Sequence, residues 1–222
     1  MDWSALWLSL RLGAFTVLFL LPIALFAGRA LAYSDRAGKS VAEAVVALPL
    51  VLPPTVLGYY LLVAFGAASP LGSLWQDAFG RTLVFSFDGL LLASILVNLP
   101  FAIQPAQRAF EAIPQDVREA AACCGMTPWQ AVLRVELPLA WPGLLTGLVL
   151  SFAHTLGEFG VVLMVGGSVP GETRTAAIAI YDRVQAFDEA AAGRMSMVLL
   201  ALSLLTTGLA FALSRRTGRR RP

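Results

Sequence analysis

The sequence predicts an all-α protein built from several membrane-spanning helices, and two observations predict this class. Of its 222 residues, 58% are hydrophobic and only 14% are charged, whereas about 25% of residues are charged in an average soluble domain. Five separate stretches are apolar over about 20 residues, the length at which a helix crosses a hydrocarbon layer of about 30 Å. We therefore expect residues 1–222 to form a single transmembrane domain.

The five predicted spans are joined by segments with more polar residues. The first is expected to be retained rather than cleaved, because no basic residue precedes it and its apolar run is longer than the roughly 7–15 residues of a signal-peptide core. Pro53 and Pro54 interrupt the second span and predict either a bend near a gate or a kink accommodated by packing. The predicted spans are residues 3–32, 41–65, 90–110, 139–159 and 195–213.

A less regular segment, residues 159–193, separates the fourth and fifth spans. Its apolar part, 161–165, is too short to cross a bilayer, and four glycines lie between positions 157 and 167. Irregular backbone is tolerated at membrane depth only where it is buried in protein or lines a watery cavity. We expect either a re-entrant, pore-side element or a short sixth helix.

The arginine and lysine residues predict the orientation, because basic residues near span ends are retained in the cytoplasm. Eleven of them lie within 29–40, 104–138 and the basic tail 214–222, whereas four lie in the segments that face the other side. Arg11 lies inside the first span, and its side chain is expected to reach the outer interface. We therefore expect the amino terminus outside and the carboxyl terminus in the cytoplasm, where the tail would meet anionic headgroups.

The cytoplasmic loop 111–138, hereafter the hairpin, predicts two short helices. A proline suits the first turn of the first helix, which is rich in alanine, and Gly125 is expected to end it. Thr127 has a glutamine three positions later, the spacing of a capping box, and so predicts the start of a second helix. Pro138 is expected to close the unit.

Two ordinary interpretations of the hairpin must be weighed. It can be a simple connector, or it can be a DNA-binding helix-turn-helix, whose alanine and glycine spacing it shares. The second interpretation requires several phosphate-neutralising side chains, and the second helix offers only Arg134. We therefore expect no nucleic-acid partner. Cys123 and Cys124 are adjacent and lack a distant partner cysteine, so we expect both to be reduced, as in the cytosol.

The hairpin resembles a motif of the membrane subunits of ATP-binding-cassette importers. The match consists of "EAA" at 119–121, then Gly125, Val135 and "LP" at 137–138. Val135 stands where isoleucine is commoner, which is a mild departure. The resemblance implies that the hairpin is a coupling element, which sits in a cleft of a separate ATPase subunit. The coupling residues that it implies are Glu119, Ala120, Ala121, Gly125, Met126, Trp129, Leu137 and Pro138.

Three further stretches resemble the permease subunits of molybdate and tungstate importers. They are "LPLVLPPTVLGYYLL" at 48–62, "GRTLVFSFDGLLLA" at 80–93 and "LGEFGVVLMVGGSVPGETRTAAIAIY" at 156–181. Sulfate and thiosulfate permeases are the alternative within this group. The resemblance covers nearly the whole chain and implies the fold of a type I importer permease.

The same resemblance implies a set of partners. They are a second copy of this chain, a dimer of cytoplasmic ATPase subunits, a periplasmic or extracellular molybdate-binding protein, and the lipid of the cell inner membrane. ATP would be used by the ATPase partner, and no cofactor is expected on this chain. The rival class, a polytopic membrane enzyme, is disfavoured because the sequence shows no paired carboxylates, no glycine-flanked serine nucleophile and no phosphate-binding glycine loop.

A path for a doubly charged oxyanion should present hydroxyls, amides and helix amino termini rather than carboxylates. Spans two to four offer such groups, although serine and threonine also serve to pack transmembrane helices together. The candidate pathway and gate residues are Pro53, Pro54, Thr55, Asn98, Ser151, Thr155, Gly157 and Glu158.

His154 and Glu158 are four residues apart and should share a helix face. The spacing allows a metal site or a proton relay, but catalytic zinc normally has three protein ligands and no third ligand is apparent. We expect no metal. The pair is expected to satisfy itself, or Glu158 to face the glycine-rich turn that follows.

Overall fold

The structure, a computed structural model, describes residues 1–218, with side chains through Gly208. Within residues 1–218 all the regular secondary structure is helical and no strand occurs, so the all-α prediction is confirmed. Its elements are α1 (Trp3–Ala32), α2 (Lys39–Val51), α3 (Pro54–Phe65), α4 (Pro70–Phe79), α5 (Phe87–Glu111), α6 (Gln115–Cys123), α7 (Pro128–Ala131), the π-helical turn η1 (Val132–Glu136), α8 (Leu137–Gly157), α9 (Gly160–Gly166), α10 (Ala176–Gln185) and α11 (Glu189–Gly218).

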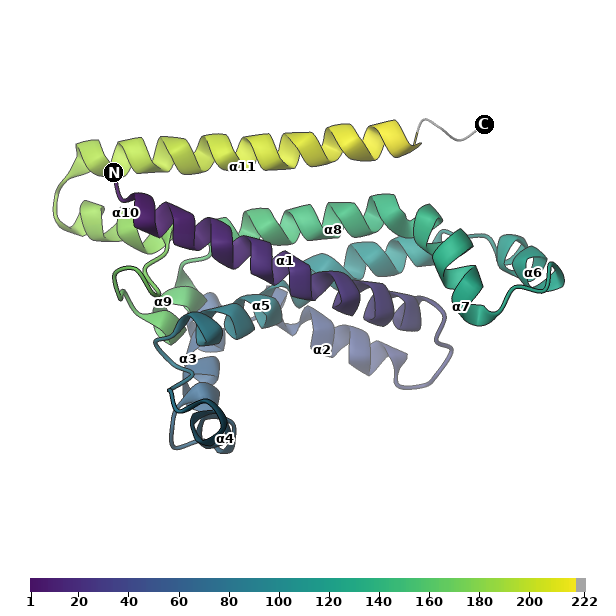
Figure 1. The fold of residues 1–222 in the computed structure, drawn as a ribbon, viewed down its shortest axis with the longest axis horizontal. Helices are drawn as coiled ribbons and strands as arrows, with labels where there is room; N and C mark the ends of the chain where they lie inside the picture. Colours follow the sequence, from purple (N-terminus) through teal and green to yellow (C-terminus); the bar gives the residue numbers. More distant parts are fainter. Residues whose placement is uncertain (219–222) are drawn as a thin grey trace.

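Three long helices, α1, α5 and α8, pack together and form the centre of the bundle, while α11 lies along α8 (Figure 1). Their shared core contains Leu20, Ala106, Phe110 and Leu144, each with no exposed surface. These residues come from all three helices, so the core depends on the three helices lying side by side.

Two glycines bring α8 very close to α5. A Cβ atom at Gly143 would lie 2.4 Å from the Cβ of Ala109, and one at Gly147 would lie 3.0 Å from the carbonyl oxygens of Phe101 and Ala102. The glycines are four residues apart and therefore share one face of α8. Small residues at this spacing let transmembrane helix backbones approach each other closely.

Four stretches are long and apolar enough to span a membrane, namely Trp3–Ala32, Phe87–Glu111, Pro128–Gly157 and Glu189–Gly208. The pair α2 and α3 makes a fifth if the two helices are counted as one bent span. The prediction of five spans is therefore confirmed, with the second span broken.

The break lies at the two predicted prolines and is sharper than a kink. The axes of α2 and α3 differ by 109°, and Leu52 and Pro53 between them have extended backbone, with ψ of 137° and 136°. A residue that precedes proline is pushed out of the helical region, and two successive prolines do so twice. Residues 41–65 are therefore two helices rather than one straight span.

The expectation that Pro138 closes the hairpin is wrong. Helix α7, the turn η1 and α8 run on without interruption from Pro128 to Gly157. The π-helical turn η1 connects α7 to α8. In it the Leu137 N–H donates to the Val132 carbonyl oxygen, five residues earlier. Pro138 lies in the first turn of α8, where a missing N–H costs little.

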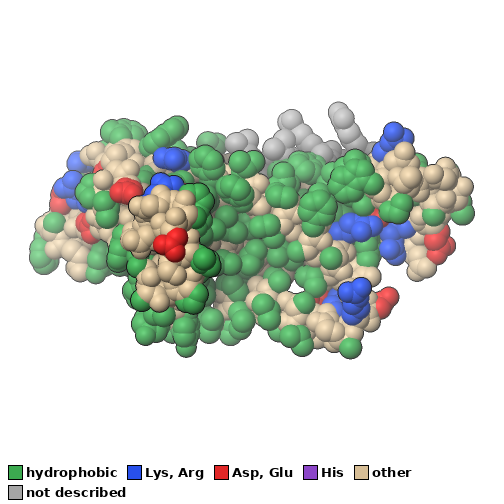
Figure 2. Space-filling model, turned by 60° about the horizontal axis from the view of Figure 1, so that its bottom comes forward, with side chains coloured by type: hydrophobic (Ala, Val, Ile, Leu, Met, Phe, Trp, Pro, Cys, Tyr) green, Lys and Arg blue, Asp and Glu red, His purple; other side chains and the backbone are tan. Residues whose placement is uncertain are grey.

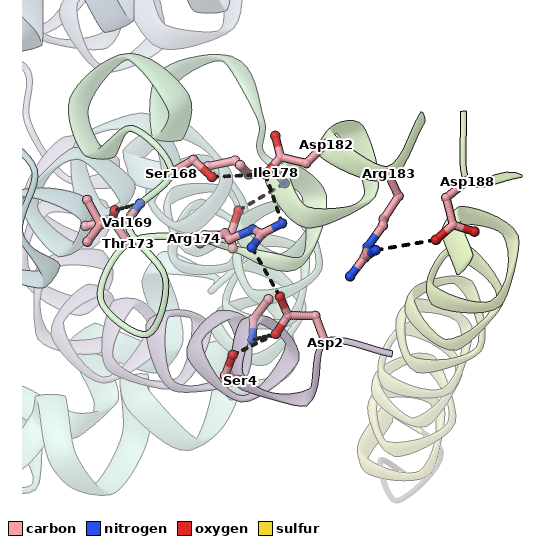
Figure 3. A network of polar contacts seen from close by, with 12 residues as sticks. Asp2, Ser4, Ser168, Val169, Thr173, Arg174, Ile178, Asp182, Arg183 and Asp188 are labelled. Atoms are coloured by element: carbon pink, nitrogen blue, oxygen red, sulfur yellow. Dashed lines mark hydrogen bonds and ion pairs between the residues drawn. The ribbon is translucent and has the colours of Figure 1, made fainter. Parts of the chain in front are cut away.

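The predicted irregular segment contains α9, a buried helix of seven residues that packs against α3 and α5. It is too short to cross a bilayer, and it is the short additional helix that the sequence allowed; its place beside a pore stays a prediction. The loop after it is held by Arg174, which lies 3.7 Å from the Asp2 carboxylate and 3.1 Å from that of Asp182 (Figure 3). The loop is thus tied to the start of α1 and to α10.

Charged side chains on the face shown in Figure 2 gather toward the two ends of the molecule, and hydrophobic side chains cover the middle. The exposed apolar residues of the described chain include Val45, Leu48 and Val51 of α2 and Val63 of α3. This distribution suits a protein that crosses a bilayer. The side chains of the predicted basic tail, 214–222, lie outside the described residues.

Candidate functional site

The first candidate site is the hairpin, which projects from one end of the bundle (Figure 1). Gly125 follows α6 with a φ of +74°, a left-handed conformation that glycine adopts without strain. The next N–H, of Met126, bonds to the Ala121 carbonyl oxygen and closes the helix end. Thr127 and Gln130 form a complete capping box at the start of α7. The predicted pair of helices meeting at a glycine is therefore present.

The coupling residues implied by the resemblance differ in exposure. Glu119 and Ala120 are exposed, and the Glu119 carboxylate accepts a hydrogen bond of 2.7 Å from the Gln115 side chain. Trp129 is 56% exposed and stacks on Phe26 of α1. Of the others, Ala121 is buried, Met126 and Leu137 are half-buried, and Gly125 and Pro138 are exposed. The hairpin thus offers a polar helix and an aromatic ring to a partner.

An ion pair that sequence reasoning missed joins the hairpin to the bundle. The carboxylate of Glu136, in the turn η1, is 5% exposed and lies 2.5 Å from Nε and 3.1 Å from the terminal nitrogen of Arg29. The two residues are 107 positions apart in sequence. Only the fold brings them together; the orientation prediction used Arg29 as one basic residue near a span end and did not use Glu136.

A second link joins α6 to the end of α1. The guanidinium of Arg118 lies 4.1 Å from the centre of the Tyr33 ring, a distance suited to a cation–π contact. The Tyr33 hydroxyl donates to the Phe110 carbonyl oxygen at the end of α5. Burial raises the pKa of Tyr33 above its ordinary value, with the nearby Glu136 carboxylate adding to the effect. Tyr33 therefore remains a neutral donor at physiological pH.

The second candidate site is a polar cluster inside the bundle. Thr16 of α1 donates to the Ser94 hydroxyl of α5 at 3.0 Å, and Ser94 lies 3.3 Å from the Thr155 hydroxyl of α8. The Asn98 amide donates to the Ser94 carbonyl oxygen at 2.8 Å and to Thr155 at 3.1 Å. All four side chains are buried. The cluster thus satisfies its own polar groups, as buried groups in a membrane must.

His154 continues this cluster toward the break between α2 and α3. Its Nδ1 lies 3.2 Å from the Asn98 side-chain oxygen, its Nε2 lies 3.7 Å from a Glu158 oxygen, and its ring stacks on Phe101. His154, Phe101 and Glu158 line a cavity of about 210 Å³, together with residues on both sides of the break such as Leu52 and Pro54. The site therefore joins the broken span to the core.

The backbone at the start of α9 holds the Glu158 side chain in place. It follows α8 directly, and its second carboxylate oxygen accepts a hydrogen bond of 2.9 Å from the Val161 N–H at the start of α9. A Cβ at Gly160 would lie 2.8 Å from the Cβ of Pro54, so α9 contacts the start of α3 closely. Of the two expectations, Glu158 faces the glycine-rich turn and accepts from its backbone, whereas the pair with His154 is not hydrogen-bonded, because 3.7 Å is too long.

The structure gathers some of the predicted pathway residues and separates others. Pro54 and Glu158 line the cavity, and Asn98 and Thr155 lie one layer behind His154. Ser151 donates to the Gly147 carbonyl oxygen of its own helix. Pro53, Thr55 and Gly157 are exposed and do not line the cavity. Among the residues that the structure describes, no group of three His, Cys, Asp or Glu side chains is placed to hold a metal ion.

Comparisons with known proteins agree with this architecture. The sequence model of the family described as "Binding-protein-dependent transport system inner membrane component" matches residues 21–219. The molybdenum transport system permease protein ModB of Azotobacter vinelandii is 46% identical, over 92% of this chain and 90% of that protein. ModB of Escherichia coli K12 is 36% identical over the same shares. The sulfate permease CysT of Escherichia coli K12 is 33% identical, over 82% of this chain and 66% of its own.

Solved structures share the fold at lower identity. A chain of a bacterial ABC transporter that imports alginate superimposes with a TM-score of 0.76 at 17% identity, over 96% of this chain and 78% of that chain. A chain of the inward-facing MetNI methionine ABC transporter gives a TM-score of 0.73 at 20% identity, over 98% and 96%. At these identities the likeness concerns the fold alone.

Proposed function

Because the chain belongs to the family of binding-protein-dependent transport system inner membrane components, we propose that it is the permease subunit that passes molybdate inward in an ATP-binding-cassette importer. A separate ATPase drives the transport by alternating access. We choose molybdate as the ion because the chain is 46% identical to a molybdenum permease over nearly the full length of both chains. The lower identity to the sulfate permease makes sulfate the second candidate.

The attachment of the hairpin supports its role as the docking site for the ATPase. It projects beyond the bundle, where a second protein has access to Glu119 and Trp129 (Figure 1). It continues into α8 without a loop and is tied to α1 by the pair of Arg29 and Glu136. A force applied to the hairpin is therefore transmitted to α1 and α8 together, as rigid-body transport motions require.

The cavity at the α2–α3 break supports a translocation path beside α2, and a second copy of the chain completes it. His154 is 32% exposed at the side chain, and an ionisable group within a membrane faces protein or a watery cavity rather than lipid. No residue of α2 is buried, and both tyrosines of α3 are exposed. Two copies that face each other across α2 and α3 would shelter these groups.

The positions of the basic residues support an orientation with the hairpin in the cytoplasm. Arg29, Lys39, Arg108 and Arg118 lie near the hairpin end, where α1 and α5 end and α2 and α6 begin. The helix α11 runs back toward that end, so the carboxyl terminus would lie inside and the amino terminus outside (Figure 1). The membrane would be the cell inner membrane.

Transport in reconstituted vesicles tests the proposal. The chain, its ATPase and its binding protein should accumulate radiolabelled molybdate when ATP is supplied, with tungstate competing strongly and sulfate weakly. Strong competition by sulfate alone would favour the second candidate. The purified chain without the ATPase should turn over no substrate, which separates a transport subunit from a polytopic enzyme.

The coupling role needs its own variants. Glu119→Lys reverses the charge of the exposed hairpin carboxylate and should lower uptake about tenfold or more while the chain still inserts and dimerises, since about 1.4 kcal/mol of lost interaction corresponds to a factor of ten. Asp35→Lys makes the same change on the exposed loop between α1 and α2 and should leave uptake within about twofold. Equal uptake by both variants would exclude the hairpin as the coupling element.

A further inference from the structure

We propose that His154, in its protonated form, is the residue that cancels the charge of Glu158 in the cavity at the α2–α3 break and so admits a tetrahedral oxyanion past that carboxylate. The inference rests on the proposed function. It assigns a specificity-determining role to His154, and neither the docking function of the hairpin nor the family resemblance implies such a role.

The cavity contains one carboxylate and one side chain that can oppose it. Of the described residues that line it, Glu158 and His154 alone are ionisable. The side chains from α2, α3 and α9 are aliphatic or proline, and α5 contributes Val97 and Phe101. Glu43 of α2 and Arg108 of α5 line a different cavity, of about 320 Å³, nearer the hairpin end. The charge of the cavity is therefore set by this pair.

Hydrogen bonds determine which nitrogen of His154 carries the proton in the neutral ring. The Asn98 amide nitrogen donates to the Ser94 carbonyl oxygen, which can only accept, so the orientation of the amide is determined. The Asn98 oxygen then faces Nδ1 of His154 at 3.2 Å. Because that oxygen is an acceptor, Nδ1 carries hydrogen. In neutral His154 the other nitrogen, Nε2, is a bare acceptor.

This bare nitrogen faces a carboxylate. Nε2 lies 3.7 Å from the nearer Glu158 oxygen, which is too long for a hydrogen bond and places two electron-rich atoms opposite each other. Protonation of Nε2 turns this repulsion into attraction and makes the pair neutral overall.

The charge of the pair matters for an anionic substrate. A doubly negative oxyanion is repelled by an uncompensated Glu158 in an apolar cavity, where water does little to screen the charges. With His154 protonated the cavity is neutral, so the oxyanion meets no net negative charge at the break in the span. Glu158 itself cannot simply turn away, because its other oxygen is held by the Val161 N–H.

A charge-rescue experiment in reconstituted vesicles tests the inference. His154→Gln leaves Glu158 uncompensated and should lower the molybdate uptake rate about tenfold or more. Glu158→Gln keeps an oxygen for the Val161 N–H but removes the charge, so its uptake should no longer depend on the protonation of His154. The double variant His154→Gln, Glu158→Gln should recover to within about threefold of wild type. Wild-type uptake should fall as pH rises through the titration of His154, and the Glu158→Gln profile should be flatter.

The outcomes separate the inference from the proposed function. A wild-type complex that does not transport molybdate contradicts the proposed function itself. If the wild type transports but His154→Gln does so equally well, or if the double variant is as slow as His154→Gln, the inference is wrong. His154 is the sole histidine of the chain, so nuclear magnetic resonance of the labelled imidazole, with a histidine-free tag, reports its titration directly. An unchanged titration in Glu158→Gln would also overturn the inference.

Discussion

At the scale of single residues, Glu136 is the least exposed charged residue in the described part of the chain. Its side chain is 5% exposed and its charge is compensated by Arg29, whose side chain is 35% exposed. Removal of one partner of a buried pair leaves an unpaired charge, whereas replacement of both partners by apolar residues is often nearly neutral. The pair therefore affects both the stability of the fold and the attachment of the hairpin.

Arg29→Ala should lower the free energy of unfolding by about 2–3 kcal/mol, less than the full penalty for a buried pair because Arg29 is partly solvated. The measurement is the thermal or denaturant unfolding of the protein in detergent. Arg108→Ala, which removes a side chain that is 80% exposed from its pair with Glu111, should cost about 0–0.5 kcal/mol. Arg29→Met combined with Glu136→Leu should recover most of the loss, and equal losses in both single variants would contradict the argument.

At the scale of elements, the helices are shaped by where the backbone is interrupted. Two prolines separate α2 from α3 by a bend of 109°, and α8 is followed by Glu158 in extended backbone before α9 starts. The two interruptions meet at the cavity. Discontinuous helices at membrane depth commonly form the binding sites of transporters, so the irregular elements rather than the regular ones define the internal site.

Gly147→Val should disrupt the packing of α8 against α5. Even the first added carbon would lie 3.0 Å from two carbonyl oxygens of α5, so the helices must separate, and we expect a loss of about 1–3 kcal/mol in the free energy of unfolding. Gly193→Ala is the matched control, because nothing lies within 4 Å of a Cβ at that position of α11. In a helix this change should stabilise by about 0.5–1 kcal/mol. A neutral Gly147→Val would show that α5 and α8 are not in close contact.

The contact between α1 and the loop before α10 should weaken in acid. The hydrogen bond from Ser4 lowers the pKa of Asp2 below its ordinary value, with Ala5 N–H, Arg174 and Arg183 adding to the effect. A lowered pKa means that the contribution to stability is present above the ordinary value of about 3.9 and is lost as pH falls through the folded-state pKa. Hydrogen-exchange protection factors of residues 167–175, corrected for the intrinsic exchange rate at each pH, should therefore fall below about pH 4 in the wild type, and Asp2→Asn should remove this pH dependence.

At the scale of the whole molecule, charged side chains gather toward the two ends of the face shown in Figure 2, and hydrophobic side chains cover its middle. The hairpin, with both cysteines of the chain, lies at one end, and the connection between α10 and α11 lies at the other (Figure 1). Both cysteines are free and exposed. They therefore report directly on which side of the membrane the hairpin lies.

In right-side-out vesicles that contain the chain without its ATPase, an impermeant maleimide should label Cys123 and Cys124 only after the membrane is permeabilised. Ala186→Cys, in a background with both native cysteines changed to serine, should be labelled before permeabilisation because Ala186 is exposed at the opposite end. Labelling of the native cysteines in intact vesicles would place the hairpin outside and would contradict the proposed orientation.

The sequence by itself determined the long apolar helices, the hairpin and the break in the second span, but it did not show the short helices α4 and α10. These features depend on local chemistry: apolar runs of sufficient length, a capping box, a glycine at a left-handed position and two prolines in succession. It failed at Pro138, which was expected to close the hairpin but lies within a continuous helix. The tolerance of a proline depends on whether the preceding turn is widened, and a local pattern does not show this.

Only the tertiary structure decided which polar groups meet. It paired Arg29 with Glu136 across 107 positions and joined Asn98 to His154 across 56. It also showed that Pro54 and Glu158 line the cavity, whereas Pro53, Thr55 and Gly157 do not. The physical reason is that a helix face is set by short-range periodicity, whereas the facing partner is set by how α1, α5 and α8 rotate and approach, which Gly143 and Gly147 control through contacts distant in sequence.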